Sequence, residues 1–186
     1  MRGETSVRRI RFILFILAAM LILAGCGGGD SPGGDIDPGQ ELVYIVDLCF
    51  VNAEYAITGD EELPALRYYP RQNMFAIQGE QYFTLLDVML REGMSGIESL
   101  DTMIDDRVQF NSVEVSGNTA FVDIKGAGLS GSSLEEGLLI SQIVNSLIGS
   151  FEEVERVQFL VDGETTDTLM GHYDASQPFE TGIYPI

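Results

Sequence analysis

The sequence contains a single histidine, His172, so chemistry that needs an imidazole has one possible centre. Asp162 and Asp174 are near it in the chain, and a histidine with two carboxylates can transfer protons or bind a metal ion. The segments GHYD and Asp162-Gly163, however, have the composition of ordinary turns. One histidine also excludes a zinc centre built from several imidazoles within the chain. We therefore predict that the protein is not an enzyme and has no catalytic residue, no metal site and no cofactor.

Other residues that could carry chemistry fall into weaker patterns. Asp101, Asp105 and Asp106 could chelate calcium, but they lack the alternating carboxylates of an EF-hand loop. The glycine-rich segment GAGLSG, residues 126–131, lacks the lysine of a phosphate-binding loop and is interpreted as a connection. Serine-hydrolase, Walker and zinc-protease motifs do not occur in the sequence.

One stretch combines basic and aromatic residues and is the predicted binding patch. Such a patch can stack on sugars or contact an acidic partner surface. The alternative is that the aromatic side chains fill the core under an irregular segment. The patch consists of Arg67, Tyr68, Tyr69 and Arg71, with Phe75 close by.

Residues 1–25 have the layout of a secretory signal peptide, with arginines followed by the apolar run 12–24 and then small residues. The run is shorter than the roughly 20 residues that a membrane-spanning helix needs. It ends in LAGC (Leu23, Ala24, Gly25, Cys26), which resembles the bacterial lipobox. We expect Cys26 to become the first mature residue, to carry fatty acyl chains such as palmitate, and to anchor the protein on the extracytoplasmic face of the cell membrane. The alternative is that Cys26 is an ordinary thiol and the segment before it an ordinary signal peptide or a short anchor.

The expected mature chain is strongly acidic. Residues 26–186 hold 6 basic and 28 acidic residues, a net charge of −22. Such a chain is repelled by phosphate backbones, which argues against nucleic-acid binding. The excess can serve solubility or docking to a basic partner. We predict a flexible linker over residues 26–40, rich in glycine and proline, and one domain over residues 41–186.

The domain shows a helix-and-strand pattern with short turns. The apolar run 42–51 predicts a strand buried on both faces, in which Cys49 is an inert buried thiol. The order strand, helix, strand, strand, helix, strand predicts an α+β fold, a two-layer sandwich with a mainly antiparallel sheet and two helices on one face. The expected elements are the strand 42–51, an irregular excursion 52–73 with a short strand at 66–69, the helix 80–92, a loop over 93–106, a hairpin about Gly117-Asn118, the helix 134–151 and the strand 154–163.

The segments NTAFVDIKG, LLISQIVNSLIGSF and VERVQFLVDG, followed by GHYD, resemble the GerMN domain, here in a single copy. The resemblance implies a fold similar to ring-building motifs and a non-catalytic interaction or assembly role on an envelope lipoprotein, in sporulation or germination. It implies envelope proteins as partners, with a homo-oligomer as one arrangement. The alternative function is an extracytoplasmic module that binds carbohydrate or peptidoglycan.

Overall fold

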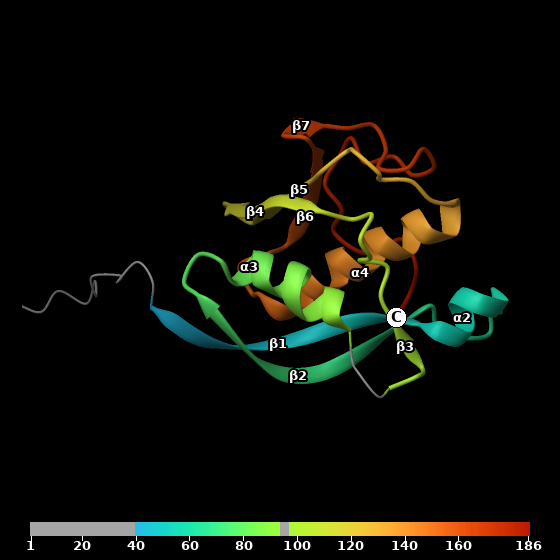
Figure 1. Cartoon of the computed structure of the whole chain (residues 1–186), viewed down its shortest axis with the longest axis horizontal. Helices are drawn as coiled ribbons and strands as arrows, with labels where there is room; N and C mark the ends of the chain where they lie inside the picture. The colour runs from blue at the N-terminus through green and yellow to red at the C-terminus, as the bar shows by residue number, and fades with distance from the viewer. Residues whose placement is uncertain (1–39, 94–96) are drawn as a thin grey trace, which may run out of the picture. The chain divides into compact units, whose positions relative to one another are not determined.

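The computed structural model describes residues 40–93 and 97–186, which are drawn in colour in Figure 1. The predicted signal peptide, the lipobox with Cys26, and the linker up to residue 39 lie outside the described residues. Within the described part of the chain, no helix is both long and apolar enough to cross a bilayer. The described residues belong to one compact unit.

The first sheet is built on a long antiparallel hairpin. Strand β1 (Glu41–Asn52) pairs with β2 (Leu66–Ile77), and the short strand β3 (Leu100–Asp101) joins the other edge of β1 near its end. The hairpin ladder is irregular between Val46 and Leu48, where Arg71 of β2 adopts a φ of 51°. β2 is an edge strand, which is where a sheet tolerates its Pro70.

The second sheet has the strand order β4-β5-β6-β7. Strands β4 (Phe110–Ser116) and β5 (Thr119–Ile124) form the predicted hairpin, and Gly117 in the turn has the positive φ of 63° that glycine adopts without strain. Strand β6 (Arg156–Val161) is parallel to β5, because the chain returns to the sheet through a helix. A turn at Asp162 and Gly163 then leads into β7 (Glu164–Thr165).

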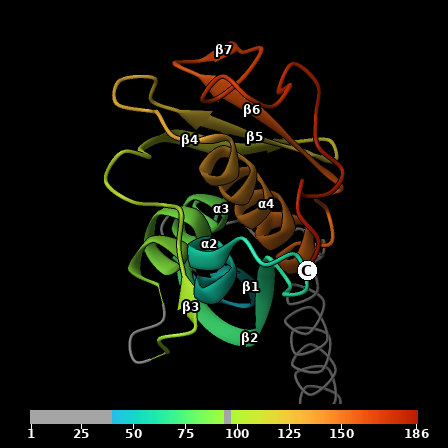
Figure 2. The ribbon, with the colours of Figure 1, turned by 90° about the vertical axis from the view of Figure 1, so that its right-hand side faces the viewer.

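The short helix α2 (Ala53–Thr58) follows β1, and α3 (Gln81–Phe83) continues into the π-helical segment η1 (Thr84–Leu90). Helix α4 (Ser133–Ser150) contacts β1, β2 and β6 and is buried over most of its length. The segment formed by α3 and η1 lies with helix α4 between the two sheets, whereas α2 lies beyond the end of β1 (Figure 1 and Figure 2). The main core therefore contains residues of both sheets, of η1 and of α4. It includes Phe50, Leu86, Ile143 and Phe159.

Helix α4 also supplies hydrogen bonds to the edge of β1. The Ser146 hydroxyl accepts from the Cys49 N–H at 2.9 Å, and the Ser150 hydroxyl accepts from the Asp47 N–H at 3.1 Å. Each hydroxyl also donates to the carbonyl of the same strand residue, at 3.5 Å and 3.1 Å respectively. Serines four residues apart face the same side of a helix, so they meet alternate residues of the strand. Thus two hydroxyls take the place of a neighbouring strand.

A buried carboxylate fixes the segment that follows β7. Glu136 of α4 is fully buried, and its oxygens accept hydrogen bonds from the backbone N–H groups of Leu169, Met170 and His172 at 2.8–3.0 Å. An unpaired carboxylate at this depth would be costly, and three donors offset that cost. The C-terminal segment is thereby held against the first turns of α4.

Most of the predicted elements are confirmed. The α+β class, the mainly antiparallel pairing, the hairpin about Gly117, the last helix and the last strand agree with the sequence analysis. The prediction of a single sheet is wrong in detail. The long β2 occupies one edge of β1, and α4 and β3 occupy the other, which leaves no edge of β1 for the second sheet.

Three local predictions need correction. The excursion 52–73 is not irregular, since it contains α2 and the start of a β2 twelve residues long. The helix 80–92 is not a regular α-helix: its π-helical turn adds a residue, so that Leu90 joins Leu85 and Leu86 in the core. The strand 42–51 is buried on both faces only from Leu48 onward; before that residue its outer face is exposed.

Candidate functional site

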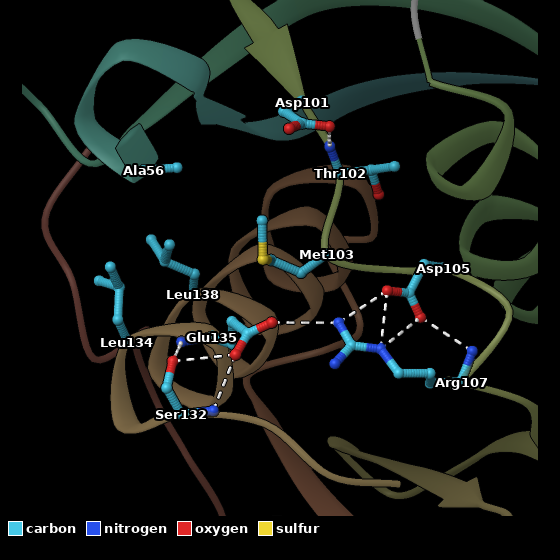
Figure 3. A pocket seen from close by; sticks show the side chains of 10 residues that line it. All are labelled: Ala56, Asp101, Thr102, Met103, Asp105, Arg107, Ser132, Leu134, Glu135 and Leu138. Atoms are coloured by element: carbon cyan, nitrogen blue, oxygen red, sulfur yellow. Dashed lines mark hydrogen bonds and ion pairs between the residues drawn. The ribbon is translucent and has the colours of Figure 1, made fainter. Parts of the chain in front are cut away.

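A recess of about 470 Å³ lies at the N-terminal end of α4 (Figure 3). One wall is the segment from β3 toward β4, the second is the first turns of α4, and Ala56 of α2 borders the third side. Apolar side chains from two of these elements form part of the lining, and charged groups form the rim. The apolar group comprises Met103, Leu134 and Leu138, and the charged group Asp101, Asp105, Arg107 and Glu135.

The start of α4 is set by a capping box. The Ser132 hydroxyl accepts from the backbone N–H of Glu135, and the Glu135 carboxylate accepts from the backbone N–H of Ser132 at 2.8 Å. Both interactions satisfy donors that would otherwise be unpaired at a helix N-terminus. The S-x-x-E spacing is visible in the sequence, and it places the Glu135 carboxylate at the mouth of the recess.

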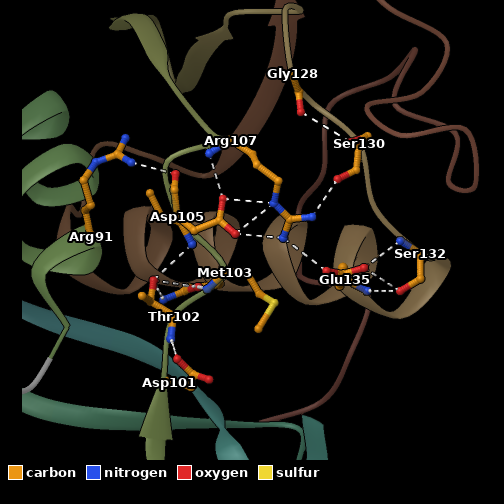
Figure 4. A network of polar contacts seen from close by, with 12 residues as sticks. Arg91, Asp101, Thr102, Met103, Asp105, Arg107, Gly128, Ser130, Ser132 and Glu135 are labelled. Atoms are coloured by element: carbon orange, nitrogen blue, oxygen red, sulfur yellow. Dashed lines mark hydrogen bonds and ion pairs between the residues drawn. The ribbon is translucent and has the colours of Figure 1, made fainter. Parts of the chain in front are cut away.

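Arg107 connects the two charged walls (Figure 4). Its guanidinium makes a two-pronged contact with Asp105 at 2.7–2.9 Å, reaches Glu135 Oε1 at 3.1 Å, and donates to the Ser130 carbonyl at 3.0 Å. Arg91, at the end of η1, donates to the carbonyl of Asp105 at 2.8 Å and so holds the same segment from behind. The planar fork of arginine makes this fixed geometry possible.

These contacts keep the acidic groups ionised. The hydrogen bond from Arg107 lowers the pKa of Asp105, and hydrogen bonds from Ser132, its backbone first, lower the pKa of Glu135. Asp105 in turn raises the pKa of Arg107. Three carboxylates and one guanidinium leave the rim with a net negative charge. Asp105 and Glu135 are both paired with Arg107, and Asp101 accepts a hydrogen bond from the Thr102 N–H, so each carboxylate of the rim already has a partner.

The predicted binding patch does not form one surface. Tyr68 and Tyr69 are consecutive residues of β2, so their side chains point to opposite faces of the sheet. The Tyr68 hydroxyl donates to the Asn145 carbonyl of α4 at 3.3 Å, and Tyr69 packs against the main core. Arg67 is exposed, while the backbone N–H of Arg71 donates to Asp47 at 3.0 Å. The described recess at the start of α4 includes none of these four residues.

The three residues of the hypothetical acid–base trio have separate partners. His172 Nε2 contacts the Gly131 carbonyl at 3.2 Å, Asp162 accepts from the Gly126 N–H, and Asp174 accepts from the backbone and hydroxyl of Ser176. Across residues 40–93 and 97–186, no group of three or more His, Cys, Asp or Glu side chains could hold a metal ion.

Cys49 is fully buried, as predicted. Burial raises the pKa of its thiol to about 12, so almost none of it is thiolate at neutral pH. The side chain of Asn145 counteracts this shift only in part. The Cys49 thiol is therefore inert in the folded domain.

Sequence reasoning did not find the roles of Arg107 and Glu136. Glu136 lies four residues before Ile140, so it continues the apolar stripe of α4, and a carboxylate in such a stripe indicates a buried anchor. Nothing in the local sequence of Arg107 identifies its partner Glu135, which is 28 residues away.

Comparison with known proteins agrees with this architecture. A family model described as Germane, sporulation and spore germination, matches residues 47–167, more than half of the chain. The chain belongs to the Germane family. The Germane match confirms the resemblance to the GerMN domain and links the chain to sporulation and spore germination. Among curated proteins, no sequence matches this chain significantly.

Solved structures resemble this chain at low sequence identity, and one of them, with a TM-score above 0.5, shows the same fold. The first GerMN domain of the sporulation protein GerM from Bacillus subtilis has a TM-score of 0.53 at 10% identity, over 75% of this chain and 97% of that one. A predicted lipoprotein from Clostridium perfringens has a TM-score of 0.49 at 18% identity, over 81% and 93% of the two chains. The tandem GerMN domains of the Bacillus subtilis protein give 0.47 at 16% identity, over 84% of this chain and 50% of that one.

Proposed function

We propose that this protein is a lipid-anchored, extracytoplasmic envelope protein whose Germane domain is a non-catalytic binding module in sporulation or spore germination. The family match supports the process. The signal-like segment and the LAGC sequence support the anchor at Cys26. The observation that carries the binding role is the recess at the start of α4, in which Arg107 is held between Asp105 and Glu135.

The arrangement favours binding because its polar groups are fixed before any partner arrives. The capping box holds Glu135, and Arg107 holds Asp105, so little side-chain freedom remains to be lost on association. The acidic rim fits a basic side chain, and Met103 and Leu134 offer an apolar surface beside it. The net charge of −22 favours approach by a basic envelope protein.

Cross-linking in the native membrane tests this proposal. The wild-type chain is expected to capture a specific envelope protein, and Cys26→Ala is expected to release the chain from the membrane fraction. Leu134→Arg adds a positive charge and bulk to the recess and should abolish the cross-link. Val88→Arg, on the exposed side of η1, is the matched control and should retain it.

Other outcomes would contradict the proposal. Capture that is equally strong in Leu134→Arg would remove the recess from the interface. Recovery of wall fragments instead of a protein would favour the carbohydrate-binding alternative. A measurable turnover that is lost when His172 is replaced would refute the non-catalytic role.

A further inference from the structure

The outer face of the β1–β2 hairpin is apolar and exposed. Val43, Ile45 and Phe75 are 57%, 64% and 60% exposed, and Ile77 is 41% exposed. Val43 pairs directly with Phe75 across the strands, and Ile45 and Ile77 lie at the neighbouring positions of the same face. We call Val43, Ile45, Phe75 and Ile77 the hairpin face.

The opposite side of the same strands is buried, so the hairpin is oriented by its core. Val46 and Met74 are almost completely buried, and Tyr44 packs against Phe151. A strand with one face in solvent usually alternates polar and apolar residues along its sequence. Here the run Leu42–Val46 is apolar at every position, as in a strand that is covered on both sides. A contiguous exposed apolar surface of this kind marks an interaction site.

The charges on strands β1 and β2 indicate which kind of surface can cover the hairpin face. β1 and β2 carry two acidic residues, Glu41 and Asp47, and two basic residues, Arg67 and Arg71. The two strands are therefore neutral in a mature chain of net charge −22, and the other acidic residues of the hairpin lie in its connection, at the end that carries α2. An anionic bilayer surface repels acidic segments within about one Debye length. The two strands are a part of the domain that can approach such a surface without this repulsion.

The hairpin is also close in the chain to the lipid anchor proposed above, on which this inference rests. Fourteen residues separate Cys26 from Glu41, and a chain of that length can reach at most about 50 Å. The strand that begins at Glu41 is the one that carries Val43 and Ile45. Four side chains bind a bilayer weakly by themselves, but a short tether greatly raises their effective concentration at the membrane.

We propose that the hairpin face lies in the interfacial region of the bilayer that holds the Cys26 lipid, so that the domain is oriented on the membrane by two contacts. Phe75 and the aliphatic side chains enter the level of the lipid head groups, where amphipathic and aromatic surfaces are favoured. The opposite end of the sheet, with α2 and its exposed Ile57, remains in water (Figure 1).

A single introduced tryptophan tests the orientation, because the sequence contains none. Phe75→Trp reports from the hairpin face, and Ile57→Trp, on α2, is the matched control at another exposed position. Each lipidated full-length variant is reconstituted in vesicles of phosphatidylethanolamine and phosphatidylglycerol, with or without bromine on the acyl chains. The Phe75→Trp emission is expected to shift to shorter wavelength and to be quenched by the brominated lipid. The Ile57→Trp emission should remain unquenched, and adding Val43→Glu to Phe75→Trp should reduce the quenching.

The possible failures are distinguishable. If the wild-type chain does not sediment with vesicles, the lipid anchor is wrong, and the orientation proposed here fails with it. If the chain sediments but Phe75→Trp is quenched no more than Ile57→Trp, the anchor stands and the membrane contact is refuted. A wavelength shift that depends on protein concentration and not on brominated lipid would show that a second copy of the chain covers the face, which also overturns the proposal.

Discussion

Replacement of Ser146 by alanine should destabilise the domain through one backbone group of β1. The Cys49 N–H donates to the Ser146 hydroxyl at 2.9 Å, and both residues are fully buried. Without the hydroxyl, this N–H has no partner and no access to water, which costs about 1–3 kcal/mol. Alanine gains about 0.5 kcal/mol in helix propensity. The expected net loss in the free energy of unfolding is therefore about 0.5–2.5 kcal/mol, a substantial part of a typical total of about 5–15 kcal/mol.

Urea denaturation of the mature chain and its variants measures this loss. Ser150→Ala should cost less, about 0.5–1 kcal/mol, because Ser150 is only partly buried and water can replace its hydroxyl. Ser133→Ala, at the exposed start of the same helix, is the control and should change stability little. Hydrogen exchange at the Cys49 amide should become faster in Ser146→Ala. A Ser146→Ala variant as stable as Ser133→Ala, with unchanged exchange at Cys49, would refute the role of the helix hydroxyls at the strand edge.

Three further predictions concern charged and reactive groups. Glu136→Gln should lower the free energy of unfolding by about 2–4 kcal/mol in denaturation experiments, because an amide cannot accept three N–H hydrogen bonds as a carboxylate does. Glu180→Gln, at an exposed position, is the control and should leave stability unchanged. Equal losses in the two variants would contradict the role of Glu136 in holding the C-terminal segment. Alkylation of Cys49 in the folded chain at pH 8 should be about a thousandfold slower than in urea, since its pKa rises from 9.0 to about 12. Because the raised pKa favours the neutral thiol of the folded state, the contribution of Cys49 to stability should be complete below pH 9 and fall as the pH rises from about 9 to 12. Rapid alkylation before unfolding would contradict the burial. Arg107→Gln should raise the pKa of Asp105 toward its ordinary value in an NMR titration. The wild type keeps the stability from this ion pair until the pH falls through the lowered pKa of Asp105, and the variant should lose it at a higher pH. An unchanged Asp105 titration would exclude Arg107 as the main cause of the lowered pKa.

The sequence predicted those elements whose signals are local. Gly117 marks the turn between two alternating strands, and the S-x-x-E pattern at Ser132 marks the start of α4. Helix α2 also has local signals at both ends: the Asn52 side chain accepts a capping hydrogen bond at its start, and Gly59 ends it in a left-handed conformation. The acidic composition of this segment and its Pro64 favoured the prediction of an irregular structure, but the segment forms the short helix α2.

The candidate site was only partly accessible from the sequence. Asp101 and Asp105 were recognised as carboxylates that could bind a cation, and a helix was predicted over residues 134–151. Their meeting in one recess depends on Arg107 contacting Glu135, which is far away in the chain. The aromatic patch was recognised by composition, but strand alternation separates Tyr68 from Tyr69.

The sequence by itself determined where most strands and helices form, how acidic the chain is, and which family it resembles, because periodicity, capping residues and composition act over short distances. Only the tertiary structure decided that the strands divide into two sheets, that Glu136 is a buried anchor, and that the face with Val43 and Phe75 is left exposed. The physical reason is that a strand edge or an apolar face can be satisfied by many partners. Which partner meets it depends on contacts between distant segments, such as the hydrogen bond of Ser146 to the edge of β1.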